Sequence, residues 1–419
     1  MPDCARGPRL NPTDIHAQIW IARARGLAPM LAVAAPRIEG ARALPGDVLD
    51  ALHDAKLFRT LLPRSLGGGE LDLATFFQVA GAIAEGDAST AWCVVQNSGC
   101  SMSAAYLAPQ AALEVFGDPR SVLAWGFPAG APCLAVPADG GWTVHGTWGF
   151  ASGNRHSAWL GGHCRVADPA GAPLKHPDGR PVERTMLFPR SCATIRDDAW
   201  DVIGLRGTGS DTYSVAGLFV PAAHSIVARA IGRDQQPPGG APAEVETERR
   251  EPGTLYRFAA TNVYQCGFAA VALGIARATL DAFIALARTK APAAALVPLR
   301  DDHRIQWRVA RSEARLGSAR AWLMQILDEM WDECAASGTI SFENRIRLRL
   351  ASTHAIHEGR QVVEDAYADA GATAIFEIHP FERRLRDMHA VSQQLQASAA
   401  HFQSAGQHYL GLTPSVRFI

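Results

Sequence analysis

Residues 121–231 differ in periodicity from the sequence on either side of them. They break into short runs rich in β-branched and aromatic residues, such as "SVLAWGFPAG" and "TYSVAGLFVP", and Gly, Pro, Asn and Asp separate the runs. Short runs divided by turn residues are typical of a β-sandwich or a β-barrel. We therefore predict a central β domain over residues 121–231, which is either a sandwich or a barrel.

The flanking segments have helical periodicity. Residues 1–120 contain "VLDALHDAKLFRTLLP", in which apolar residues recur every three or four positions before a proline. Residues 254–419 hold four long helical patterns, which predict a four-helix bundle. Residues 232–253 are charged and rich in Pro and Gly, which indicates a linker or loop. The chain is therefore expected to be a multi-domain α+β protein, with an N-terminal helical domain, a central β domain and a C-terminal bundle.

Composition excludes several classes of partner. The formal net charge is −1, so the chain lacks the basic surplus of a nucleic-acid-binding protein. We find no uninterrupted apolar run of the roughly 18–20 residues that span a membrane, and no signal-peptide pattern. The eight cysteines form no CxxC pair, which is typical of reduced thiols in a cytoplasmic protein. We expect a cytoplasmic protein that acts on a small molecule.

Common nucleotide and metal motifs are missing from the sequence. No G-x-G-x-x-G follows a predicted strand, and there is no P-loop. His354 and His357 are spaced to share a helix face, but no acidic residue is placed to complete a metal site. We therefore predict neither a dinucleotide-binding fold nor a bound metal.

Several longer motifs resemble the acyl-CoA dehydrogenase superfamily. They are "LPRSLGGGELD" and "GDASTAWCV" in the first part, "GTWGFASGNRHSAWL" and "GLRGTGSDTYSVAGLFVP" in the middle, and "LYRFAATNVYQCGFAAVALGIARATLDAF" in the last part. Within the superfamily the chain is most similar to the two-component flavin-dependent monooxygenases, which hydroxylate aromatic compounds. The resemblance implies that the middle domain, residues 121–231, is an antiparallel β-barrel. It further implies a homotetramer with flavin between this barrel and the bundle. It also implies reduced FMN or FAD from a separate NAD(P)H-dependent flavin reductase, and a small aromatic or heterocyclic substrate.

The same resemblance gives the "GTWGFASG" motif a place beside the flat flavin ring. Trp148 and Phe150 alternate along a predicted strand, so both are expected on one face together with Ser152. The resemblance places Ser152 near flavin N5 and places Trp125 and Phe127 on a second strand beside the ring. Without the resemblance, aromatic residues at this spacing fit the interior of a barrel at least as well.

The other cofactor candidates lie outside these strands. Thr208 and Ser210 belong to a Gly-rich loop whose hydroxyl and backbone groups could reach the flavin or the substrate. Arg257 offers a planar fork of donors to a flavin phosphate or to the ring edge. A salt bridge at the start of a helix is an equally good interpretation of Arg257.

Two positions separate dehydrogenation from oxygenation. An acyl-CoA dehydrogenase needs a carboxylate that removes a carbon-bound proton, and the family places this Glu at one of two positions. The present chain has Leu395 at one and Tyr256 at the other, and a tyrosine with an ordinary pKa of about 10 is no base at neutral pH. We therefore favour a monooxygenase. The alternatives are a dehydrogenase-like flavin oxidoreductase with a displaced base and a non-catalytic ligand-binding relative.

The last helical pattern departs from the hydroxylases, which carry R-D-x-H-x-x-x-x-H. This chain keeps His389 but has Gln394 at the second histidine, and glutamine forms hydrogen bonds without exchanging protons. Either the substrate needs no deprotonation, as for an indole-like ring, or another residue acts as base. His389 and His156 are the candidates, although His389 could equally be a structural partner of Asp387. The predicted catalytic set is Ser152, His389 and Gln394.

Overall fold

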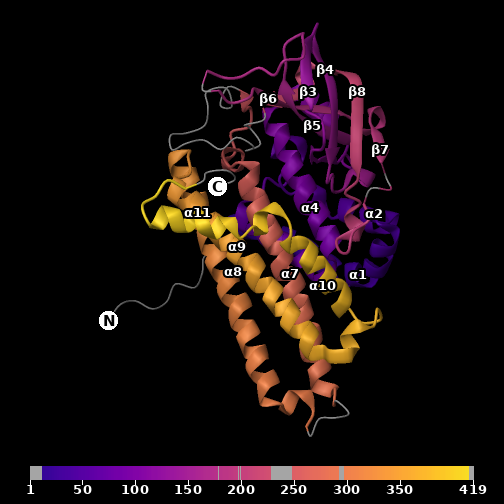
Figure 1. Cartoon of the computed structure of the whole chain (residues 1–419), viewed down its shortest axis with the longest axis vertical. Coiled ribbons are helices and arrows are strands. Elements are labelled where there is room, and N and C mark those ends of the chain that lie inside the picture. Colours follow the sequence, from indigo (N-terminus) through magenta and orange to yellow (C-terminus); the bar gives the residue numbers. More distant parts are fainter. Residues whose placement is uncertain are drawn as a thin grey trace.

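The computed structural model describes residues 12–177, 179–196, 198, 200–227, 248–291 and 297–414. Helices come first, a sheet follows, and long helices complete the chain, as the sequence predicts (Figure 1). The predicted linker over residues 232–253 lies mostly outside the described residues.

The helices before the sheet are α1 (Pro12–Ala41), α2 (Gly46–Asp54), α3 (Leu73–Gly86), α4 (Ala88–Ser101) and α5 (Pro109–Phe116). Aspartates begin the two most buried of them, α3 and α4. The Asp72 carboxylate accepts the N–H of Thr75 at 2.7 Å, and the Asp87 carboxylate accepts the N–H of Thr90 at 2.7 Å. Each cap satisfies a backbone donor that the helix itself leaves unpaired.

The central sheet is mixed and open, so the prediction of an antiparallel barrel is wrong. The strands are β1 (Leu123–Trp125), β2 (Phe127–Pro128), β3 (Leu134–Ala138), β4 (Gly141–Gly149), β5 (Trp159–Val166), β6 (Glu183–Pro189), β7 (Thr194–Arg196), β8 (Thr212–Pro221) and β9 (Ser225–Val227). The main order is β7-β8-β4-β3-β5-β6-β9, with β1 on β5 and β2 on β4. Strand β5 runs parallel to both β1 and β3. Within the described residues the sheet ends at β7 and at β9, and these two strands do not pair with each other to close a barrel. Short apolar runs predict that strands exist, but they carry little information about which strands pair.

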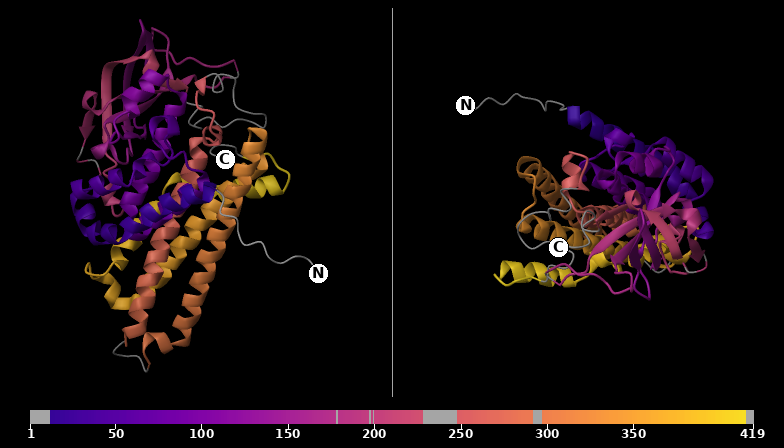
Figure 2. Two further views of the ribbon diagram at one scale, coloured as in Figure 1. Left: turned by 180° about the vertical axis from the view of Figure 1, so that it is seen from behind. Right: turned by 90° about the horizontal axis from the view of Figure 1, so that it is seen from above.

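The C-terminal helices are α7 (Ala260–Thr289), α8 (His303–Ser337), α9 (Phe342–Ala370), α10 (Phe381–Ser392) and α11 (Ala400–Tyr409). Helices α7 to α10 lie side by side as a bundle (Figure 1). The predicted fourth long helix is interrupted: Gln394 is extended (φ −78°, ψ 164°), and a short 3₁₀ turn at Leu395–Ala397 separates α10 from α11. Figure 2 shows the sheet at one end of the molecule, with the long bundle helices extending away from it.

One apolar core joins the N-terminal helices to the bundle, and the sheet has a second, smaller core. Helix α7 lies at the centre of the first core and packs on α3 and α9. A Cβ at Gly274 would lie 2.5 Å from the carbonyl oxygen of Gly81, so the close approach of α7 and α3 requires glycine there. Helix α7 is long and apolar enough to span a membrane, which our count of uninterrupted apolar residues missed, but 61% of its most apolar window is buried inside the protein.

Candidate active site

Ser152 lies in a turn after β4, at the junction of the sheet with α4. Asn97 of α4 holds this turn: its side-chain amide donates to the Ser152 carbonyl at 3.3 Å and to the Leu123 carbonyl at 3.1 Å. Gly153 has φ +80°, and a Cβ there would lie 2.4 Å from Oδ1 of Asn97. The turn therefore requires glycine after Ser152.

The predicted common face of Trp148, Phe150 and Ser152 does not exist. Strand β4 ends at Gly149, and Phe150 has φ +59°, so the two-residue alternation stops there. Trp148 is fully buried and stacks on Tyr213 in the sheet core, whereas the Phe150 side chain is 66% exposed. Trp148 also donates its indole N–H to the His163 carbonyl at 3.1 Å. The structure thus gives Trp148 the role of core residue.

A line of hydrogen bonds joins Ser152 to the Gly-rich loop. The indole N–H of Trp92, on α4, donates to Ser152 Oγ at 3.0 Å. Ser152 Oγ lies 2.7 Å from Ser210 Oγ, and Ser210 Oγ lies 2.7 Å from Thr208 Oγ1. Thr208 Oγ1 donates to the Leu205 carbonyl at 2.8 Å. The structure therefore brings the three predicted hydroxyl residues into direct contact, in a site where each is at most 4% exposed.

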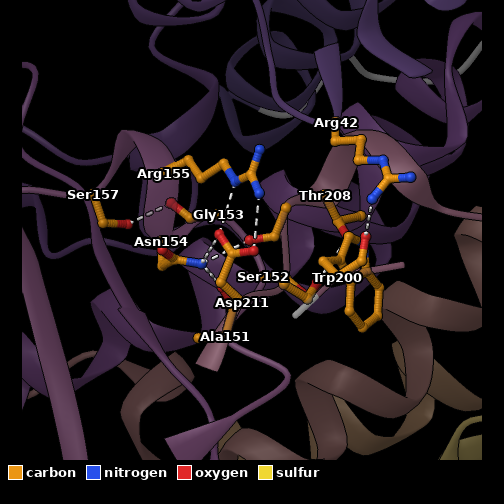
Figure 3. Close-up of polar contacts among 12 residues, drawn as sticks. Arg42, Ala151, Ser152, Gly153, Asn154, Arg155, Ser157, Trp200, Thr208 and Asp211 are labelled. Atoms are coloured by element: carbon orange, nitrogen blue, oxygen red, sulfur yellow. Dashed lines mark hydrogen bonds and ion pairs between the residues drawn. The ribbon is translucent and has the colours of Figure 1, made fainter. Parts of the chain in front are cut away.

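A buried ion pair fixes the two loops that carry these hydroxyls. The Asp211 side chain is fully buried, and Arg155 binds it through Nε at 2.7 Å and Nη2 at 3.0 Å. Asn154 donates to Asp211 at 3.4 Å and to the Gly209 carbonyl at 2.6 Å (Figure 3). Sequence reasoning missed Asp211 and Arg155, although each lies within three residues of a predicted site residue. The signal in the sequence was a pair of opposite charges: Arg155 shortly after Ser152, and Asp211 directly after Ser210.

Stacked aromatic rings lie beside Ser152. Trp92 stacks on Phe268 of α7 with ring centroids 3.9 Å apart, and Phe268 stacks on Tyr264 at 5.7 Å. The Tyr264 hydroxyl is 3.4 Å from Gln96 Nε2, and burial raises its pKa. Tyr264 and Phe268 are four residues apart on one helix, the spacing at which side chains meet. We did not single out Trp92, Tyr264 or Phe268 from the sequence.

The other aromatic candidates divide between the interior and the surface. Trp125, on β1, is 5% exposed and packs edge-on against His163 at 5.2 Å. Phe127, on β2 and opposite Gly149 of β4, is 54% exposed. Phe127 therefore lies near the exposed Phe150, while Trp125 faces the protein interior.

The two C-terminal candidates have different surroundings. His389 is half-exposed, and its Nε2 lies 3.8 Å from Glu364. Among the described residues the hydrogen bond of the Asp387 carboxylate is to the Leu205 N–H and not to His389. Gln394 accepts the N–H of Gln396 at 2.9 Å. Its Nε2 is buried and has no hydrogen-bond partner among the described residues. A buried donor without a partner is costly and is expected to serve a bound molecule or water.

Asp387 links the bundle to the Gly-rich loop. Its buried carboxylate accepts the backbone N–H of Leu205 at 2.7 Å. Burial raises the pKa of Asp387 to about 7, and Asp87 and Glu39 act in the same direction, while the Leu205 N–H and Arg383 lower it. Leu205 has φ +53°, a conformation that a leucine adopts only when its surroundings impose it.

Three remaining candidates make structural contacts. Arg257 is exposed and donates to the Gly338 carbonyl at the end of α8, at 3.3 Å, and its predicted role at the flavin stays a prediction. Tyr256 is buried, donates to the Leu61 carbonyl at 3.2 Å, and has a pKa that burial raises far above neutrality. His156, a candidate base, lies in the interior: its Nε2 is 3.2 Å from Asn97 Oδ1, and burial lowers its pKa to about 3.

Among the described residues the site offers hydrogen-bonding groups and aromatic faces, and its two neighbouring carboxylates are already bound. Arg155 binds Asp211, and the Leu205 N–H is bound to Asp387. By the family resemblance, Tyr256 and Leu395 hold the two positions where a dehydrogenase base would stand. In the part of the chain that the structure describes, no group of His, Cys, Asp and Glu could hold a metal ion.

Comparison with known proteins decides the family. Residues 266–399 match the family described as acyl-CoA dehydrogenase, C-terminal domain. The indole-3-acetate monooxygenase of Pseudomonas putida is 30% identical over 378 residues, which are 89% of each chain. The flavin-dependent monooxygenase, oxygenase subunit HsaA, of Rhodococcus jostii is 29% identical over 88% of this chain and 92% of that one. This chain belongs to the flavin-dependent monooxygenases of the acyl-CoA dehydrogenase superfamily.

A solved structure supports the same assignment. The crystal structure of the HsaA monooxygenase from M. tuberculosis superposes on this monooxygenase with a TM-score of 0.82 and 26% identity, over 96% of this chain and 100% of that one. The open mixed sheet between two helical regions is therefore part of a known fold.

The residues of this monooxygenase fit a flavin ring. An isoalloxazine needs apolar contact on its faces and a few fixed hydrogen bonds at its edge. Phe150 and Phe127 supply exposed aromatic surface, and Ser152 supplies a hydroxyl oxygen beside the Trp92 ring, which stacks on Phe268. The unpartnered Nε2 of Gln394 is a further donor of the kind that a flavin carbonyl or a substrate would satisfy.

Proposed function

We propose that this chain is the oxygenase component of a two-component system and oxygenates a small aromatic or heterocyclic molecule. Its cofactor is reduced FMN or FAD, made by a separate NAD(P)H-dependent flavin reductase. The observation that carries the proposal is Ser152, held by Trp92 and Ser210 next to stacked aromatic rings, without an available carboxylate. The name of the relative HsaA, an oxygenase subunit, supports the separate reductase.

When bound, reduced flavin supplies the electrons that activate dioxygen. The protein's own residues bind, orient and exclude water. Ser152 would hold the N5 edge of the ring. Thr208 and Ser210 fix the Ser152 hydroxyl. Their burial keeps water away from this edge, which favours oxygen transfer over release of peroxide.

The proton chemistry of the site favours a substrate that needs no strong base. Gln394 cannot accept a proton, the low pKa of His156 leaves it neutral, and His389 is half-exposed beside Glu364. An indole-like ring or a heteroatom is electron-rich without deprotonation. The relative from Pseudomonas putida is named for indole-3-acetate, a molecule of this class.

The assembly and location of the protein complete the proposal. We infer a homotetramer in the cytoplasm, without nucleic-acid or membrane partners, from the family resemblance, the balanced charge and the scattered cysteines. Mass photometry at nanomolar concentration measures the subunit number directly. A monomeric mass would overturn the inference of a tetramer.

The experiment that tests the function combines the protein with a flavin reductase, NADH, FMN or FAD, and a panel of indole-3-acetate, indole and resorcinol. We expect a hydroxylated product from at least one compound and a matching fall in hydrogen peroxide. Release of all reducing equivalents as peroxide with every compound would count against the proposal. Bleaching of a tightly held yellow flavin by acyl-CoA esters would instead establish a dehydrogenase.

A further inference from the structure

The hydrogen bonds from Trp92 to Leu205 can run in only one direction. A hydroxyl group has a single proton to donate, an indole N–H can only donate, and a carbonyl can only accept. The carbonyl of Leu205 ends the line, so the Thr208 proton points toward it. Ser210 must then donate to Thr208, and Ser152 must donate to Ser210.

This order leaves Ser152 without a free proton. Its own proton is used toward Ser210, and one lone pair on Oγ accepts the N–H of Trp92. Among the described residues Oγ has no further partner, so one lone pair remains. Toward a bound molecule Ser152 is therefore an acceptor and not a donor.

Both ends of the line are fixed by packing. The stacking of Trp92 on Phe268 holds the direction of the indole N–H. At the other end the Leu205 carbonyl also accepts the indole N–H of Trp200 at 3.1 Å and the backbone N–H of Thr208 at 3.2 Å, and the Thr208 hydroxyl at 2.8 Å is the shortest of its three contacts. The Leu205 N–H is bound by Asp387. The Leu205 peptide therefore cannot turn to present a donor to Thr208.

We propose that this one-way line of hydroxyl groups makes the site selective for reduced flavin, with Thr208 as a specificity-determining residue. The proposal rests on the proposed function, in which Ser152 meets flavin N5. Reduced flavin carries a proton on N5 and can donate it to Ser152. Oxidised flavin has only a lone pair at N5, which would face the lone pair of Ser152. The site thus releases the oxidised flavin that must leave after each turnover.

The test is the ratio of two dissociation constants, for oxidised and for reduced FMN or FAD, measured by titration without oxygen and without substrate. An unsatisfied buried acceptor costs about 1–3 kcal/mol, so we expect reduced flavin to bind about tenfold tighter or more. In Thr208→Val the Ser210 proton loses its acceptor and can turn to Ser152, whose own proton then becomes available to N5. We expect the ratio to fall about tenfold.

Matched variants keep the test decisive. Thr208→Ser retains the hydroxyl and should retain the ratio. Thr279→Val removes a buried hydroxyl that donates to the Ile275 carbonyl within α7, away from the line of hydroxyl groups, and it should also leave the ratio unchanged. If Thr208→Val does not fold, Ser210→Ala tests the same point, because it removes the acceptor of the Ser152 proton.

The outcomes separate this inference from the proposed function. Equal binding of both flavin forms by the wild-type protein, or an unchanged ratio in folded Thr208→Val and Ser210→Ala, would overturn the selectivity while leaving oxygenation intact. Failure of the wild-type protein to bind reduced flavin at all would overturn both.

Discussion

The carboxylate of Asp387 in α10 accepts the backbone N–H of Leu205 at 2.7 Å, across 182 residues of sequence. Through this bond a helix of the bundle holds the loop whose carbonyl orients Thr208, Ser210 and, beyond them, Ser152. The position of the bundle and the orientation of the Ser152 hydroxyl are therefore coupled.

Removing this carboxylate should destabilise the protein. Asp387→Ala leaves the buried N–H of Leu205 without a partner, which costs about 1–3 kcal/mol. Asp387→Asn keeps an acceptor oxygen and should cost less. Urea unfolding followed by tryptophan fluorescence measures both, and equal losses in the two variants would show that the Leu205 bond contributes little.

Stability should depend on pH through the same group. Burial raises the pKa of Asp387 from 3.8 to about 7, so the folded protein binds this proton more tightly than the unfolded chain does. The proton's contribution to stability is complete below about pH 4 and is lost as the pH rises through about 7. The free energy of unfolding of the wild type, relative to Asp387→Asn, should fall across this range. The difference removes the pH dependence that the two proteins share and keeps the interactions of Asp387 with Asp87, Glu39 and Arg383. A difference independent of pH would contradict the account.

Ser152→Ala should increase the release of hydrogen peroxide. The loss of a buried hydrogen bond of about 1–3 kcal/mol corresponds to a change of about 5- to 150-fold in the partition between oxygen transfer and peroxide release. Peroxide and product are measured together at fixed reduced flavin. Ser101→Ala is the control, because the Ser101 hydroxyl donates to the Ser98 carbonyl within α4. Unchanged coupling in Ser152→Ala would make Ser152 a structural residue.

Arg155→Met should destabilise the fold by about 3 kcal/mol, because it leaves the buried Asp211 carboxylate unpaired. The double variant Arg155→Met with Asp211→Asn removes the unpaired charge and should recover part of this loss. Denaturant unfolding of the wild type, Arg155→Met, Asp211→Asn and the double variant gives the coupling energy between the two side chains. A double variant no more stable than Arg155→Met would contradict the assignment of the loss to the charge.

Local sequence patterns were enough to place most of the secondary structure. The Asp caps of α3 and α4 and the apolar periodicity of α7 are encoded within a few residues of each element. The barrel was wrong because the parallel pairing of β5 with β3 depends on contacts that no local pattern records. The break between α10 and α11 was missed because the sequence around Gln394 contains neither proline nor glycine.

The parts of the site that lie within one short continuous motif could be predicted from the sequence. Ser152, Thr208 and Ser210 do come together, although no pattern shows that Trp92 completes the line. The predicted common face of Trp148, Phe150 and Ser152 was wrong because the strand ends at Gly149 and Phe150 adopts a left-handed backbone conformation. Alternation along a strand holds only while the strand continues.

The most direct test of the central claim is isotopic labelling with ¹⁸O₂ in the presence of a flavin reductase, NADH, flavin and a substrate from the panel. A monooxygenase should place one atom of ¹⁸O in the hydroxylated product, and mass spectrometry should show a shift of about two mass units in nearly every product molecule. Product that carries oxygen from water, or a product that has lost hydrogen without gaining oxygen, would contradict the account.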